Sequence, residues 1–155
     1  MEETLYIKEF TVLHPTFYHA FEPWRKSLAD YPIQSGVYTL RSSIPVCRAL
    51  GKDDEGVLYI GKGLILSPLH RLGNLINALN NTDSRHEAGV RYNQKEKANI
   101  QTIEHYRDFG YSKKYPLNQM ILRIELLEHP EVEEHKRLCA YLDKFGELPP
   151  LNRRL

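Results

Sequence analysis

The chain has 155 residues, of which 41% are hydrophobic and 26% are charged. These values are typical of one soluble globular domain, and we expect residues 1–155 to fold as a unit. A formal net charge of +1 excludes attraction to polyanions by overall charge, so a nucleic-acid site would have to be a local patch. Two cysteines, an acidic N-terminus without a signal-peptide pattern and the lack of a membrane-spanning apolar run predict a cytoplasmic protein.

Residues 1–34 combine strand-like runs with aromatic side chains. The runs are residues 4–7 and 10–13, and the aromatic residues are Phe17, Tyr18, Phe21 and Trp24. We favour the simpler interpretation, that these rings cover one face of a sheet. The alternative is an extension that stacks on bases or pairs two subunits, because aromatic residues are enriched at such interfaces.

The most informative stretch is residues 36–63. Val37–Leu40 and Val57–Ile60 are β-branched, aromatic or apolar, as strands prefer. Between them, Ser42–Glu55 is rich in turn-forming residues. We therefore predict a β-hairpin with a long connection, in which the glycines after the second strand let another group approach the backbone.

Three further elements are predicted in the second half of the chain. Residues 67–79 begin with Ser-Pro, which favours a helix start, and then repeat apolar residues at helical spacing. A basic and aromatic stretch, 85–92, precedes a predicted helix over 94–109. Alternating apolar and charged residues predict a strand over 120–127.

The last predicted helix covers residues 130–146, with proline at its start and glycine at its end. At about 100° per residue, Glu134 lies with Leu138 and Tyr141 toward the apolar face. Glu133 points nearly opposite, toward water. Glu134 is thus the carboxylate of this helix that has no ordinary structural reason for its position.

Two short motifs on the predicted hairpin resemble those of the GIY-YIG nuclease family. They are Gly36-Val37-Tyr38 and Tyr59-Ile60-Gly61, the second followed by Lys62. The resemblance spans residues 36–152. It implies an α+β fold with a small central three-stranded antiparallel sheet flanked by helices. In that fold residues 35–152 form the catalytic core, and residues 1–34 are an N-terminal extension.

The resemblance also implies roles for five positions, which match Tyr38, Tyr59, Arg71, Glu134 and Asn152. The first tyrosine is the favoured general base, the second places water or phosphate, and the arginine contacts the phosphate. The glutamate holds one Mg²⁺ or Mn²⁺ ion, and the asparagine supports the site. A free tyrosine has a pKa of about 10, so cationic Lys62, Arg71 and the metal would have to favour its phenolate form.

His86 and several basic residues extend this set. The histidine lies in an H-x-x-G stretch that resembles a feature of some family members, where a histidine is near the phosphate, and it is an alternative proton carrier. Candidates for phosphate contact are Arg85, Arg91, Lys95 and Arg153. Taken singly, each of these side chains has a simpler interpretation as a solvated or structural group.

We therefore expect a metal-dependent endonuclease that hydrolyses phosphodiester bonds in DNA, in a restriction or homing role. RNA remains an alternative substrate, and double-strand cleavage by one active site would favour a homodimer. The main alternative is a non-catalytic nucleic-acid-binding module that keeps the fold. A third is a structural or protein-interaction domain that uses the aromatic N-terminal segment.

Overall fold

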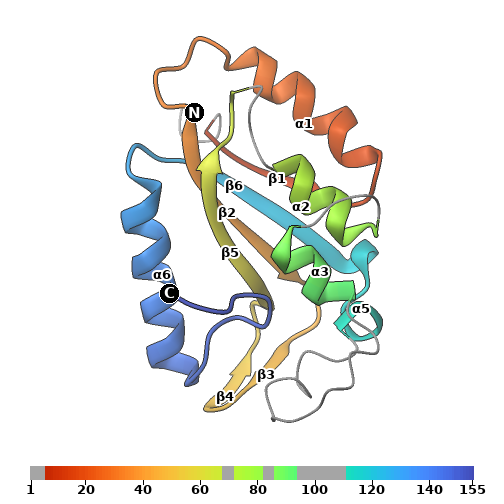
Figure 1. The fold of residues 1–155 in the computed structure, drawn as a ribbon, viewed down its shortest axis with the longest axis vertical. Helices are drawn as coiled ribbons and strands as arrows, with labels where there is room; N and C mark the ends of the chain where they lie inside the picture. The colour runs from red at the N-terminus through yellow and green to blue at the C-terminus, as the bar shows by residue number, and fades with distance from the viewer. Residues whose placement is uncertain (1–5, 68–71, 82–85, 94–110) are drawn as a thin grey trace.

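The computed structural model describes residues 6–67, 72–81, 86–93 and 111–155. It is a mixed α+β fold in which helices lie on both sides of one antiparallel sheet (Figure 1). Helices α1, α2, α3 and α5 lie to one side of the sheet, and α6 lies to the other (Figure 1). The predicted helix over 94–109 and residues 68–71 of the predicted helix over 67–79 fall outside the described residues.

The sheet has four strands in the order β1-β6-β2-β5. They are β1 (Ile7–Thr11), β6 (Met120–Leu126), β2 (Ser35–Ser42) and β5 (Val57–Leu64). The predicted antiparallel pairing of β2 with β5 is confirmed. The expectation of three strands is wrong, because β1 pairs with the outer side of β6. The segment expected to be an N-terminal extension therefore supplies an edge strand of the central sheet.

The aromatic residues near the N-terminus lie on a helix, α1 (Thr16–Ser27), which the sequence analysis did not predict. Phe17, Phe21 and Trp24 are buried, and the ring of Phe10 on β1 makes edge contacts with all three. This confirms that the cluster covers one face of the sheet. Proline at position 23 inside the helix obscured it, since proline is rare in helix interiors.

The connection between β2 and β5 contains a second, smaller hairpin. Its strands are β3 (Val46–Arg48) and β4 (Gly51–Asp53), and it projects from one end of the sheet (Figure 1). The long connection expected over residues 42–55 is thus partly ordered as strand. It is joined to α6 by a buried hydrogen bond of 2.8 Å from the Tyr141 hydroxyl to the Asp53 carboxylate.

The short helices complete the side of the sheet on which α1 lies. They are α2 (Leu72–Leu79), α3 (Glu87–Asn93), α5 (Tyr111–Lys114) and the 3₁₀ helix η2 (Leu117–Gln119). The described part of α2 buries Leu72, Leu75, Ile76 and Leu79 as the predicted stripe. Among the described residues, no helix combines the length and the apolar character needed to cross a membrane.

Helix α6 (Pro130–Phe145) begins at Pro130 and stops at Gly146, as predicted. Gly146 adopts the left-handed conformation (φ 75°), and its N–H donates to the Leu142 carbonyl at 2.8 Å. Leu138, Tyr141 and Phe145 are buried in a cluster with β2 and β5 side chains. Leu142, one turn after Leu138, is 37% exposed, so the buried face of α6 does not include it.

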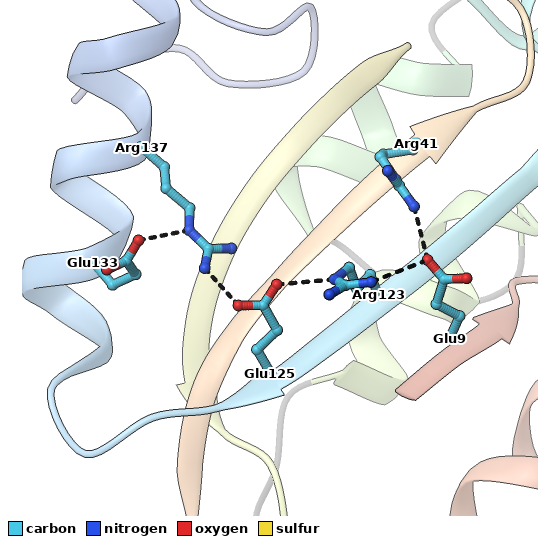
Figure 2. Close-up of polar contacts among 6 residues, drawn as sticks. All are labelled: Glu9, Arg41, Arg123, Glu125, Glu133 and Arg137. Atoms are coloured by element: carbon cyan, nitrogen blue, oxygen red, sulfur yellow. Dashed lines mark hydrogen bonds and ion pairs between the residues drawn. The ribbon is translucent and has the colours of Figure 1, made fainter. Parts of the chain in front are cut away.

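A chain of alternating charges links α6 to the sheet (Figure 2). Arg137 donates to Glu133 at 2.8 Å and also to Glu125 on β6. Arg123 continues the chain by donating to Glu125 at 2.9 Å, and its guanidinium lies 3.6 Å from Glu9 on β1. The expectation that Glu133 points to water is therefore wrong: it is partly buried and ion-paired. Burial alone would raise the pKa of Glu125, but hydrogen bonds from Arg137 and Arg123 hold it below its ordinary value.

Candidate active site

Two tyrosines from neighbouring strands lie on one face of the sheet. Tyr38 on β2 stands opposite Gly61 on β5, and the ring centroids of Tyr38 and Tyr59 are 6.2 Å apart. A β-carbon at Gly61 would lie 2.5 Å from the Tyr38 ring. Gly61 is thus needed for the Tyr38 ring to lie against β5. This steric requirement explains why the second motif has a glycine at this position.

Glu134 approaches the same edge of the sheet from α6. Its side chain is half-buried, and this burial raises its pKa, while the nearby positive charges of Lys62 and His135 act in the opposite direction. The exposed Lys62 ammonium on β5 is thus near enough for its charge to act on the Glu134 carboxylate. The helical spacing that singled out Glu134 is consistent with this position.

Tyr59 is the group on which these charges converge. Burial, followed by the carboxylates of Glu134 and Glu87, raises the pKa of Tyr59 to about 12. Both carboxylates disfavour a further negative charge on this phenol. In this environment Tyr59 keeps its proton, so it can donate a hydrogen bond to a water molecule or a phosphate oxygen.

The Asn152 side chain is hydrogen-bonded to the backbone of β5, along the edge of this strand that faces away from β2. Its amide donates to the Ile60 carbonyl at 2.9 Å, and its carbonyl oxygen accepts from the Ile60 N–H at 2.9 Å. The Leu151 N–H donates to the Leu58 carbonyl at 2.8 Å. These bonds satisfy edge-strand groups that would otherwise remain open to pairing. Asn152 therefore fixes the strand that carries Tyr59.

His86 lies against Tyr59 just before α3. The two rings meet edge to face, with centroids 5.7 Å apart. The His86 Nδ1 atom accepts a hydrogen bond from the Ala88 N–H at 3.2 Å. A neutral ring with Nδ1 as acceptor carries its proton on Nε2, so it can donate to a substrate oxygen but cannot take a proton there.

A pocket of about 240 Å³ opens at this edge of β5. Its polar lining includes Tyr59, Glu87, Glu134, Asn152 and Arg153. Tyr38 and His86 lie next to the pocket, because their rings contact that of Tyr59. The charge of Lys62 acts on Glu134 in the pocket wall. Six of the seven side chains expected to be catalytic are therefore neighbours in space, and the seventh, Arg71, lies outside the described residues.

The basic residues expected to contact phosphate are placed differently from one another. Arg153 lines the pocket, with its guanidinium 3.4 Å from the Glu87 carboxylate. Arg91 is only 8% exposed within α3, a position that does not favour the predicted phosphate contact. Arg85 and Lys95 lie outside the described residues.

Glu87 is a site residue that the sequence analysis missed. It opens α3, where a glutamate is ordinary because it complements the helix dipole. No local pattern connects it with Tyr59 or with Arg153, which lies near the other end of the chain. The signal is present only in three dimensions, where α3 and the C-terminal segment meet beside β5.

The donor set fits a hard divalent cation. Among the described residues, no group of three or more His, Cys, Asp or Glu side chains is placed to hold a metal. Mg²⁺ does not need such a group, because it keeps several waters and is commonly held by one or two carboxylates together with substrate phosphates. Glu134, a half-buried carboxylate at the pocket wall, meets that requirement.

The unusual proton affinity of Tyr59 can be measured directly. We expect its phenol to titrate at about 12, above the ordinary value of 10, in NMR spectra of protein with ring-labelled tyrosine. Glu134→Gln should lower this pKa, because it removes one of the opposing charges. Since the folded-state pKa is the raised one, this contribution to stability is complete below pH 10 and is lost as pH rises from 10 toward 12. Titration of Tyr59 at 10 or below would contradict the arrangement.

Comparisons with protein-family models, with curated proteins and with solved structures give no match to this chain. The assignment of a function therefore depends on the motifs and on the geometry of the site.

Proposed function

We propose that this protein is a Mg²⁺-dependent endonuclease of the GIY-YIG type that hydrolyses phosphodiester bonds in DNA. The observation that carries the proposal is that Tyr59 and the Glu134 carboxylate line one pocket, while the Tyr38 ring on the neighbouring strand contacts Tyr59. The three groups come from elements that are far apart in the sequence. Their convergence is what phosphodiester hydrolysis by this family's chemistry requires.

Each side chain has a defined task in this proposal. Tyr38, in its phenolate form, accepts a proton from the attacking water as the new P–O bond forms and the bond to the 3′ oxygen breaks. Protonated Tyr59 donates a hydrogen bond to a phosphate oxygen, which its raised pKa favours. Lys62 adds positive charge at the same edge of β5. Glu134 would hold Mg²⁺, which supplies charge stabilisation to the phosphate and the leaving oxygen.

The function is tested by incubating supercoiled plasmid with the protein in Mg²⁺, in Mn²⁺ and in EDTA. We expect nicked and linear products only with a divalent cation. Tyr38→Phe removes a single hydroxyl from a buried ring and should lower the cleavage rate on the order of 100-fold or more. Tyr31→Phe, in a partly exposed tyrosine that stacks on Tyr6, is the matched control and should cleave normally.

Two outcomes would contradict this proposal. Cleavage that persists in EDTA would show that the reaction needs no divalent cation. Full activity of Tyr38→Phe would show that Tyr38 is not the general base. An RNA substrate of the same sequence, tested in parallel, decides which nucleic acid is cut. Sequencing of the cleaved ends shows which side of the phosphate is broken and whether a recognition sequence exists.

A non-catalytic nucleic-acid-binding module is the second candidate. It is favoured by the near-complete burial of Tyr38, which is 5% exposed, because a base must reach water. The plasmid experiment separates the two functions when it is combined with a binding assay. Salt-dependent DNA binding without any cleavage in Mg²⁺ or Mn²⁺ would establish the module and exclude the enzyme.

A further inference from the structure

Glu87 and Arg153 form an ion pair at the rim of the pocket. The Arg153 Nε atom lies 3.4 Å from the Glu87 Oε1 atom, and both side chains line the pocket with Tyr59 and Glu134. The Glu87 side chain is 70% exposed, and the Arg153 side chain is 46% exposed. Such solvent-screened pairs contribute little free energy, so a better partner can replace either member.

The pocket is lined by charges of both signs, and the negative ones oppose the binding of a phosphate. Glu87 and Glu134 both act on Tyr59, so the pocket holds two carboxylates that repel an entering phosphodiester. A divalent cation at Glu134 would cancel one of them. Glu87 is offset by the guanidinium of Arg153, and the planar fork of a guanidinium is well shaped to bind a phosphate. Arg154 also lines the pocket, but no ion pair with Glu87 is seen for it among the described residues.

We propose that Glu87 is a gating residue. It holds Arg153 at the rim by the ion pair until a backbone phosphate of the nucleic acid replaces the Glu87 carboxylate as the partner of the guanidinium. This inference rests on the proposed function and adds a regulatory step to it. The exchange replaces a weak carboxylate contact by a charge-assisted pair with phosphate. The Glu87 carboxylate then remains as a repulsive charge that limits the affinity for the bound strand.

The gate makes an unusual prediction, because loss of a pocket carboxylate should strengthen binding. Fluorescence anisotropy with a short labelled DNA duplex, in EDTA at low salt, measures affinity without cleavage. Glu87→Gln should bind about two- to fivefold more tightly than the unmodified protein, the range expected for an exposed ion pair. Arg153→Ala should bind more weakly than the unmodified protein, and the gain from Glu87→Gln should shrink in that background.

Glu55→Gln is the control for net charge. Glu55 is exposed in the turn before β5, so its replacement removes one negative charge away from the pocket and should leave affinity unchanged. A Glu87→Gln affinity equal to or weaker than that of the unmodified protein would overturn the gate. An equal gain in both Arg153 backgrounds would also overturn it, since simple repulsion would then explain the effect. No binding by any variant would overturn the nucleic-acid function itself, together with the gate.

Discussion

Glu134→Gln is expected to reduce Mg²⁺-dependent cleavage on the order of a thousandfold, because a catalytic cation supplies several kcal/mol of transition-state stabilisation. Glutamine keeps the size and the polar character of the side chain, so the change removes little except the charge that would hold the ion. Cleavage rates are measured at saturating Mg²⁺. Calorimetric titration with Mn²⁺ shows independently whether the ion still binds.

The same variant carries an internal check on folding. Burial raises the pKa of Glu134, so the folded state holds its proton more tightly than the unfolded state does. Ionisation of this group therefore lowers stability as pH rises above its ordinary pKa. Glu134→Gln should unfold at the same temperature as the unmodified protein, or at a higher one, at neutral pH without metal. Low activity combined with undiminished stability would assign the effect to the site.

Asp143→Asn is the matched control, because it removes an exposed carboxylate near the other end of α6. It should retain full cleavage and ordinary metal affinity. Cleavage by Glu134→Gln at the rate of the unmodified protein would remove Glu134 from the mechanism. Loss of activity in both variants would point instead to a general effect of charge on this helix.

Elements with a clear local pattern could be predicted from the sequence. The β2–β5 hairpin followed from two apolar runs separated by turn formers, and α6 followed from its spacing and from the residues at its ends. The start of α6 at proline and its stop at glycine depend on backbone chemistry alone. For the same reason, the side of α6 on which Glu134 lies could be derived without knowledge of its neighbours.

Features that depend on distant pairing could not be predicted. Strand β1 joins the sheet through β6, which lies far along the chain, and nothing in residues 7–11 identifies that partner. The burial of Arg91 and the pairing of Glu133 with Arg137 also depend on neighbours from other elements. Within the site, Tyr38 and Tyr59 belong to motifs, whereas Glu87 acquires its place only when α3 docks beside β5.

A single buried carboxylate joins the small hairpin to α6 and to the start of β5. Asp53 is 2% exposed, and one of its oxygens accepts hydrogen bonds from the Val57 N–H at 3.0 Å and from the Tyr141 hydroxyl at 2.8 Å. Its other oxygen accepts from the Glu55 N–H at 3.0 Å. All three contacts require an acceptor, and a carboxylate is the side chain that offers acceptors on both atoms.

Asp53→Asn should therefore destabilise the protein by about 3 kcal/mol, although it preserves the shape of the side chain. The amide presents a donor where a carboxylate oxygen accepted, so at least one buried donor loses its partner. Urea unfolding followed by circular dichroism measures the change. Tyr141→Phe, which removes one hydroxyl from the same cluster, should lower stability by only about 1 kcal/mol.

Asp54→Asn provides the control, because the neighbouring aspartate is exposed and the same substitution there should change stability by less than about 0.5 kcal/mol. A loss of under about 1 kcal/mol in Asp53→Asn would mean that this cluster does not hold the hairpin against α6.

The same substitution is also expected to affect the candidate active site. Val57 opens the strand that carries Tyr59, and Tyr141 belongs to the helix that carries Glu134, so Asp53 connects the two elements whose side chains must meet. The Asp53→Asn protein should accordingly lose cleavage activity at temperatures below its unfolding transition.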